Sequence, residues 1–157
     1  MDEYLLDSPL GLLHLKATED ALVEIYFSEE EEEKNQESLS PSSAIIVRAI
    51  EQLNEYFEGK RTTFDLPLAP EGTKFQRQVW SALRSIPFGS TISYSRLSEK
   101  LGNPKAIRAV GRANGQNPIP IIIPCHRVVG SNNELVGYAG GIERKRRLLQ
   151  HEGALLL

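Results

Sequence analysis

One cysteine, Cys125, is the residue of this sequence best suited to covalent chemistry. It follows three isoleucines and Pro124, and His126 and Arg127 come directly after it. The isoleucines indicate either a buried strand or a packed turn. A cysteine reacts as its thiolate, which nearby basic groups favour. Many single cysteines are inert core residues, but a rigid proline and two polar neighbours are untypical of a core, so we interpret Cys125 as a nucleophile.

The composition is that of a globular protein. The chain has 157 residues, 40% hydrophobic and 25% charged, enough for one domain or two small ones. A single cysteine excludes an internal disulfide and a multi-cysteine zinc site, and we expect neither a metal nor a cofactor. The N-terminus lacks the features of a signal peptide, and no apolar run is long enough to span a membrane. We therefore expect a cytoplasmic protein without a membrane partner.

Charge is divided unequally along the chain. Residues 1–71 hold 5 basic and 17 acidic side chains, a net charge of −12, whereas residues 72–157 hold 13 basic and 4 acidic, a net charge of +9. A basic half suits a polyanion, and nucleic acid is the first candidate. The sign changes within a proline-containing segment, where we place a boundary between domains 1–70 and 71–157. The acidic run 29–33 reads as a solvated loop.

The N-terminal half predicts a small sheet and one helix. Three short apolar runs between residues 3 and 27, separated by turn residues, predict an antiparallel meander of strands. Apolar residues with helical spacing predict a helix over 44–58, which Gly59 ends.

The C-terminal half predicts mainly helices. A helical pattern begins at Thr73. Ser93 can cap a short helix that stops at Gly102, and Asn103 can cap a second helix whose first residue is Pro104. Two short helices joined by a tight turn indicate a helix-turn-helix. We predict an α+β protein with a small N-terminal antiparallel sheet and one helix, then a helical domain with a helix-turn-helix.

The second of these helices carries small residues where a major-groove reader would carry long polar ones. Its small residues are Ala106, Ala109, Gly111, Ala113 and Gly115, with Lys105, Arg108 and Arg112 between them. Such a surface permits close approach to the minor groove, where one arginine can enter the base stack. The alternative is that the alanines only pack against another helix.

Two segments flank the cysteine. Residues 112–118 form a polar hinge in which Asn117 could bridge its own turn and the cysteine turn. A strongly basic helix over 142–150 follows, and Glu152 comes just after it. Beside a reactive cysteine and a histidine, Glu152 is a candidate for orienting the imidazole.

Six motifs in this order resemble the O6-alkylguanine-DNA alkyltransferases, in particular their constitutive bacterial form. They lie within residues 73–153 and are Ile92-Ser93-Tyr94, Asn103 to Gly111, Asn117-Pro118, Pro124 to Val128, Gly137 to Gly141 and His151-Glu152-Gly153. The resemblance implies single-turnover direct-reversal DNA repair, in which an alkyl group moves irreversibly from guanine O6, or from thymine O4, to a cysteine. It also implies a monomer that binds double-stranded DNA through the minor groove.

The resemblance assigns roles around the sulfur. Cys125 is the nucleophile, His126 takes its proton through a water, and Glu152 orients that imidazole. Asn117 ties the cysteine turn to the helix-turn-helix. Tyr94 assists flipping of the base and donates a proton toward guanine N3, which fits the need for a neutral leaving group.

The resemblance also assigns the contacts with DNA and with the lesion. Arg108 fills the gap left by the flipped nucleotide, and flipping is necessary because the alkyl group lies inside the duplex. The backbone contacts fall on Gln76, Ser95, Asn103 and Ser131. The substrate pocket includes Val128, Tyr138 and Ala139, and the carbonyl groups of Cys125 and Val128 read the exocyclic amine of guanine.

Two departures bear on specificity. Ala139 stands where several relatives have a serine that can donate to guanine O6, and Asn114 stands where some members have a larger apolar residue beside the flipped base. Two other functions stay open from the residues themselves. One is a lesion sensor that only binds, although such proteins lack the cysteine, and the other is a Cys-His hydrolase with Glu152 as orienter.

Overall fold

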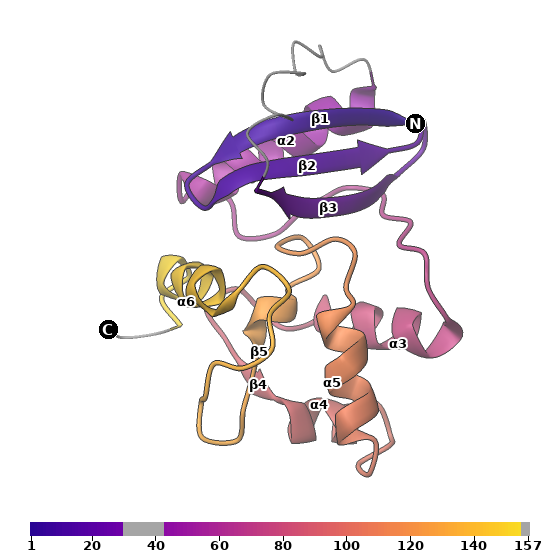
Figure 1. Ribbon diagram of the computed structural model, residues 1–157, viewed down its shortest axis with the longest axis vertical. Helices are drawn as coiled ribbons and strands as arrows, with labels where there is room; N and C mark the ends of the chain where they lie inside the picture. The colour runs from indigo at the N-terminus through magenta and orange to yellow at the C-terminus, as the bar shows by residue number, and fades with distance from the viewer. Residues whose placement is uncertain (30–42, 155–157) are drawn as a thin grey trace. The chain divides into compact units, whose positions relative to one another are not determined.

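The computed structural model describes residues 1–29 and 43–154, which form two compact units, Met1–Glu71 and Gly72–Leu157 (Figure 1). The acidic run that we interpret as a solvated loop lies, from residue 30 onward, outside the described residues. Within the described ranges, no helix is both long enough and apolar enough to cross a membrane.

An antiparallel sheet of three strands forms the base of the N-terminal unit. Its strands β1 (Asp2–Ser8), β2 (Gly11–Ala17) and β3 (Leu22–Ser28) are paired in chain order, so the predicted meander is confirmed. Successive side chains of a strand point to opposite faces of the sheet. The fully buried residues of β2 alternate accordingly: Leu13, Leu15 and Ala17.

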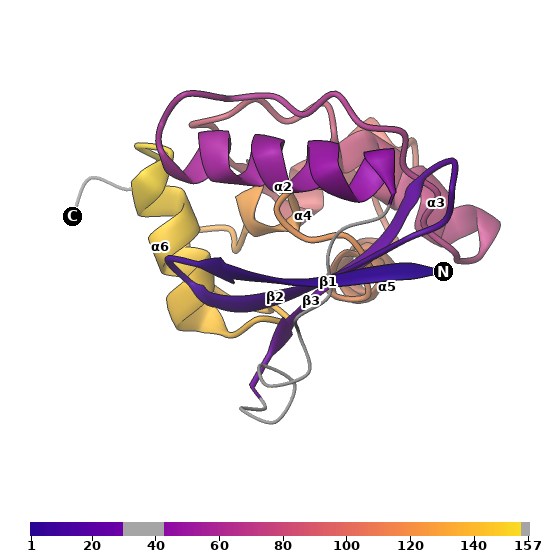
Figure 2. The same ribbon diagram turned by 90° about the horizontal axis from the view of Figure 1, so that it is seen from above.

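One helix, α2 (Ala44–Phe57), packs against all three strands (Figure 2). Ser43 caps it by accepting the N–H groups of Ile45 and Ile46, and Gly59 follows it with a φ of +77°. The predicted helix over 44–58 is therefore confirmed. Its fully buried side chains recur with helical spacing: Ile46, Ala49, Leu53 and Tyr56.

The C-terminal unit is mainly helical, and the predicted α+β class is confirmed. Its helices are α3 (Lys74–Leu83), α4 (Tyr94–Lys100), α5 (Ile107–Gly115) and α6 (Ile142–His151), and its two short strands, β4 (Ile92–Ser93) and β5 (Val128–Val129), pair in parallel. The buried Trp80 of α3 donates its indole N–H to the carbonyl oxygen of Ala113 over 2.8 Å. This bond ties α3 to α5 inside the core of the unit.

Side-chain caps fix where α3 and α4 begin. Thr73 and Gln76 form a reciprocal capping box at the start of α3. Ser93 accepts the N–H of Arg96 at the start of α4, and Gly102 follows that helix with a φ of +77°. Both features of α4 agree with the prediction.

The predicted start of the second helix at Pro104 is wrong, because α5 begins at Ile107. The carbonyl of Asn103 accepts the N–H of Ala106 over 3.0 Å and closes a four-residue turn. Ala106 occupies the position before the helix and makes no side-chain cap. The local Asn-Pro signature is therefore used in a turn, and the helix starts three residues later.

Candidate active site

Cys125 lies in a turn of buried backbone, not at the end of a strand. Of the two conformations that the isoleucine run allowed, the structure has the packed turn, in which Ile121 is fully buried with a φ of +74°. A β-branched residue rarely adopts this conformation, which costs about 1–3 kcal/mol and persists only where the surroundings impose it. Cys125 itself opens the single 3₁₀ turn Cys125–Arg127 and is 5% exposed.

Asn117 connects the segment after α5 to the cysteine turn. Its amide nitrogen donates to the carbonyl oxygen of Ile123 over 2.7 Å, and its amide oxygen accepts the N–H of Ile119 over 3.0 Å. The carbonyl of Ile123 and the N–H of Ile119 are both buried, so losing either bond would leave an unpaired backbone group. Asn117 also hydrogen-bonds toward Cys125, which favours the thiolate.

His126 and Glu152, 26 residues apart, form a buried pair. The ring Nε2 lies 2.8 Å from Oε2 of Glu152, and the His126 side chain is fully buried. Burial lowers the pKa of His126, against the hydrogen bond and charge of Glu152, so the ring is neutral. A carboxylate only accepts, so Nε2 carries the proton and Nδ1 keeps its lone pair. This Nδ1 is buried and has no hydrogen-bond partner among the described residues, which makes it a base without a proton.

Arg127 holds the Glu152 carboxylate in place. Its Nε donates to Oε1 over 2.8 Å and its Nη2 to Oε2 over 2.9 Å, while its Nη1 donates to the carbonyl oxygen of Ile86 over 2.6 Å. Burial would raise the pKa of Glu152, but the hydrogen bonds and charges of His126 and Arg127 hold it well below its usual value. Glu152 is therefore ionised throughout the neutral range, and its bidentate partner fixes the orientation of both oxygens.

The Cys125 thiol is protonated in the free protein. Burial raises its pKa to about 11, although the hydrogen bond of Asn117 and the charge of Lys145 act in the opposite direction. The sequence favoured a thiolate because of the flanking His126 and Arg127, but the first is neutral and the second is paired with Glu152. A base must therefore remove the proton when the sulfur reacts.

Lys145 is a central residue of the site that the sequence analysis missed. It lies in α6, is fully buried, and donates to the carbonyl oxygens of Val128 over 2.6 Å and Val136 over 2.7 Å. Burial lowers its pKa to about 8, against the attraction of Cys125. In the sequence it was counted only as part of a strongly basic helix, but it shares a helical face with the buried Leu148 and Leu149. That spacing could have identified it.

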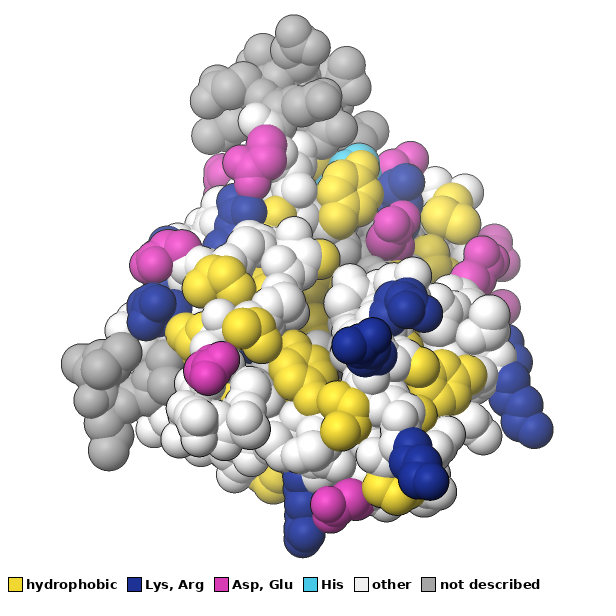
Figure 3. Space-filling view, turned by 60° about the horizontal axis from the view of Figure 1, so that its bottom comes forward, with side chains coloured by type: hydrophobic (Ala, Val, Ile, Leu, Met, Phe, Trp, Pro, Cys, Tyr) yellow, Lys and Arg dark blue, Asp and Glu magenta, His cyan; other side chains and the backbone are white. Residues whose placement is uncertain are grey.

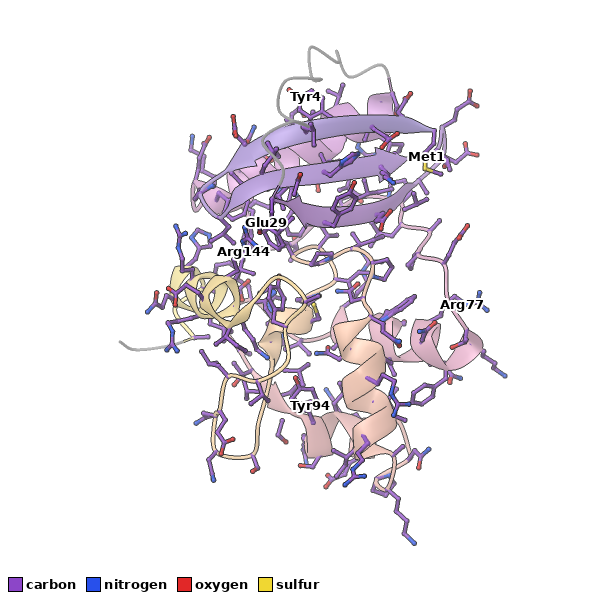
Figure 4. All side chains as sticks on the ribbon, viewed as in Figure 1. Met1, Tyr4, Glu29, Arg77, Tyr94 and Arg144 are labelled. Carbon is purple, nitrogen blue, oxygen red and sulfur yellow. The ribbon has the colours of Figure 1, made fainter. Side chains whose placement is uncertain are left out.

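Tyr94 joins α4 to the loop that follows β5 (Figure 4). Its hydroxyl donates to the carbonyl oxygen of Val136 over 3.0 Å, and the ammonium of Lys145 lies 5.9 Å from its ring centre. Burial raises the pKa of Tyr94, the charge of Cys125 adds to this, and a side-chain hydrogen bond from Asn114 opposes it. Burial also raises the pKa of Tyr138, again with a contribution from Cys125. Both phenols therefore lie within electrostatic reach of the sulfur and are neutral.

The small residues of α5 are mostly accessible. Ala113 is buried, but Ala109 and Gly111 are half-buried and Gly115 is exposed. A Cβ added at Gly115 would meet nothing within 4 Å. Packing within the protein therefore accounts for Ala113 and for Gly111, which lies against the Tyr94 ring, whereas Gly115 is open to a partner.

The residues expected to contact DNA differ in their surroundings. Gln76 is half-buried, since its amide completes the cap of α3 and donates to Gln116 over 2.8 Å. The others are exposed: Ser95, Asn103, Arg108 and Ser131. Ala139 is also exposed, whereas Val128 is buried and its carbonyl is bound by Lys145. Lys and Arg side chains lie beside apolar ones on the face seen in Figure 3.

Comparison with known proteins covers both halves of the chain. The DNA-binding domain of the 6-O-methylguanine DNA methyltransferases matches residues 74–154, and the ribonuclease-like domain of the same family matches residues 1–70. The methylated-DNA–protein-cysteine methyltransferase of Mycobacterium bovis is 46% identical over 147 residues, 94% of this chain and 89% of that protein. The constitutive enzyme of Bacillus subtilis is 44% identical over 138 residues, 85% of this chain and 84% of that protein.

Solved structures agree with these sequence matches. The Mycobacterium tuberculosis OGT in complex with DNA superimposes with a TM-score of 0.86 at 44% identity, over 97% of this chain and 92% of that one. The buried cysteine, the unprotonated Nδ1 and the ionised carboxylate thus occur in a chain that two domain models of one family match over residues 1–70 and 74–154. The chain belongs to the 6-O-methylguanine DNA methyltransferases, the methylated-DNA–protein-cysteine methyltransferases that reverse DNA alkylation directly.

Proposed function

We propose that this protein, acting as a monomer, flips an O6-alkylguanine out of double-stranded DNA and transfers its alkyl group to Cys125. The observation that carries this proposal is the unpartnered Nδ1 of His126, whose Nε2–H is fixed on Glu152. A protonated thiol and a neutral imidazole base next to it in the chain are the two partners that sulfur alkylation needs. The same site could take O4-alkylthymine, since Ala139 offers no side-chain hydrogen bond to the base.

The transfer is a single displacement. The thiol proton moves through a water to Nδ1 of His126, and the sulfur electron pair forms a bond to the alkyl carbon as the bond from that carbon to O6 breaks. His126 becomes an imidazolium, which the Glu152 carboxylate at 2.8 Å stabilises. The thioether is stable, so the protein is consumed in one turnover.

Tyr94 supplies the proton for the leaving base. Guanine departs with the electron pair of the broken bond, and the Tyr94 hydroxyl donates to N3 so that no base anion is released. In the free protein this hydroxyl donates to Val136, so it exchanges that bond for one to the base. The Lys145 ammonium over the ring and the Asn114 hydrogen bond both stabilise negative charge on the phenol oxygen.

DNA is held on α4, α5 and the loops beside them. The accessible small residues of α5 allow the helix to enter the minor groove. Arg108, exposed in the first turn of α5, replaces the flipped nucleotide in the stack, and Ser95, Asn103, Ser131 and Gln76 contact the backbone. Flipping costs a few kcal/mol, which these contacts offset.

Mass spectrometry of the intact protein tests the reaction. After mixing with a duplex that carries one O6-methylguanine, we expect one methyl group per protein, located on the Cys125 peptide. Cys125→Ser should bind the duplex without gaining mass, because serine keeps the shape but is a far weaker nucleophile. Tight binding without an adduct in the wild type would show a lesion sensor, and neither binding nor an adduct would refute the proposal altogether.

A further inference from the structure

The side-chain oxygen of Asn114 is a buried acceptor without a donor. Asn114 lies in α5 and is 1% exposed, and its Oδ1 has no hydrogen-bond partner among the described residues. Buried polar atoms are nearly always paired, so an unpaired one in a reactive site calls for an explanation.

The orientation of this amide follows from its neighbours. The amide nitrogen lies 3.4 Å from the carbonyl oxygen of Cys125, which can only accept. The Asn114 hydrogen bond also lowers the pKa of Tyr94, which requires an N–H that donates to the phenol oxygen. The nitrogen thus faces the backbone carbonyl of Cys125 and the hydroxyl of Tyr94, and Oδ1 is the atom left over.

Other acceptors of the site already have donors. The carbonyl of Val128 accepts from Lys145, and that of Val136 accepts from Lys145 and Tyr94. Nδ1 of His126 is unpaired like Oδ1 of Asn114, but the reaction uses it as the base. Oδ1 of Asn114 is therefore a buried side-chain acceptor, among the described residues, that the reaction leaves unused.

The chemistry of the lesions says which donor could reach it. Alkylation at O6 removes the hydrogen from N1 of guanine, so the 2-amino group is the remaining N–H donor of the base. Alkylation at O4 of thymine removes the hydrogen from N3 and leaves that base with none. An acceptor that meets the flipped base in this site therefore distinguishes the two lesions.

We propose that Oδ1 of Asn114 accepts a hydrogen bond from the 2-amino group of the flipped O6-alkylguanine and thereby selects it over O4-alkylthymine. This inference rests on the proposed function. The amine carries two hydrogens, so Oδ1 of Asn114 can accept one of them and one backbone carbonyl, that of Cys125 or of Val128, the other. It also supplies a source of guanine selectivity in a chain where Ala139 cannot donate to O6.

The test compares the 2-amino group in otherwise identical duplexes. Single-turnover methyl transfer is measured from O6-methylguanine and from O6-methylhypoxanthine, which lacks that amine, for the wild type and for Asn114→Leu. A wild-type preference of about tenfold or more for guanine, the size expected of one buried hydrogen bond, should fall toward one in the variant. The ratio of the two preferences cancels differences in duplex stability. Arg112→Ala, an exposed change on the same helix, should slow both substrates equally.

Three results would overturn the inference. The first is an equal slowing of both substrates by Asn114→Leu, which leaves the preference unchanged and would mean that Asn114 acts only through Tyr94. The second is a variant that folds and reacts with both substrates as fast as the wild type. The third is a wild type that transfers equally fast from both duplexes. If Asn114→Leu does not fold, Asn114→Ala serves in its place. The proposed function fails separately, since it alone requires transfer from O6-methylguanine to the wild type.

Discussion

Replacing Lys145 with methionine separates the contribution of this residue to stability from its electrostatic effect on the reactivity of Cys125. Burial lowers the pKa of Lys145 from 10.5 to about 8, which makes the charged form unfavourable by about 3 kcal/mol, and methionine removes this cost. The variant loses two charge-assisted bonds to Val128 and Val136, worth about 1.5–3 kcal/mol each. We therefore expect a net destabilisation of about 0–3 kcal/mol, or up to about 10 °C in melting temperature.

The same change should slow alkyl transfer much more than this modest loss of stability suggests. The Lys145 charge favours the Cys125 thiolate. With an effective dielectric constant near 20, a unit charge contributes about 4 kcal/mol at 4 Å and proportionally less farther away, so we take about 2 kcal/mol for this pair. The variant should therefore react about 30-fold more slowly at pH 7.

Reaction with free O6-benzylguanine measures this effect without DNA binding. The ratio of the wild-type rate to the Lys145→Met rate should fall as the pH rises above 8, because Lys145 then loses its own proton. Arg147→Met, an exposed change on the same helix, should react like the wild type. A fully folded Lys145→Met protein that reacts as fast as the wild type, or a wild-type advantage that is constant from pH 7 to pH 10, would refute the reasoning.

Two further predictions concern the DNA contact and the buried acid-base pair. Arg108→Ala should slow repair of duplex DNA at least tenfold and leave the rate of reaction with free O6-benzylguanine unchanged. Arg112→Ala should slow duplex repair much less. An equal loss of rate on duplex and on free base would exclude a role for Arg108 in flipping. The pKa of His126 is lower in the folded protein than in the unfolded chain, so the unfolded chain binds more protons as the pH drops below 6.5. The free energy of unfolding should therefore fall with falling pH, by up to about 1.4 kcal/mol per pH unit. Glu152 adds a further loss of stability below about pH 4.5, because its folded pKa is also lowered. Urea unfolding of the wild type and of His126→Asn should show that the free energy of unfolding depends more steeply on pH in the wild type. Identical slopes against pH would count against a neutral buried imidazole.

Local patterns in the sequence were sufficient to predict most of the fold. The period of two in β2 and the helical spacing of Ile46, Ala49 and Leu53 each identify one buried face. Ser93 and Gly102 define the ends of α4 because capping depends on neighbouring residues only. The start of α5 could not be predicted, since Asn103 and Pro104 fit a cap and a turn equally well.

The site was less accessible to sequence reasoning, because its chemistry depends on partners far apart in the chain. The spacing of His126 and Glu152 does not show that they meet, so the residues alone made Glu152 only a candidate, and the resemblance to a family assigned the pairing. The protonation of Cys125 depends on burial and on Arg127 being paired, neither of which a local pattern reveals. Lys145 was missed for the same reason, because a run of basic residues does not show which of their side chains is buried.

The buried, protonated sulfur also determines how long an unused molecule stays competent. With a pKa of about 11, roughly one Cys125 in ten thousand carries a thiolate at pH 7. Oxidants and stray alkylating agents attack thiolates that solvent can reach, and this side chain is both neutral and 5% exposed. A protein consumed in a single reaction cannot recover from a wasted one. The high pKa thus protects the free thiol of Cys125 from side reactions between the synthesis of the protein and its encounter with the first damaged base.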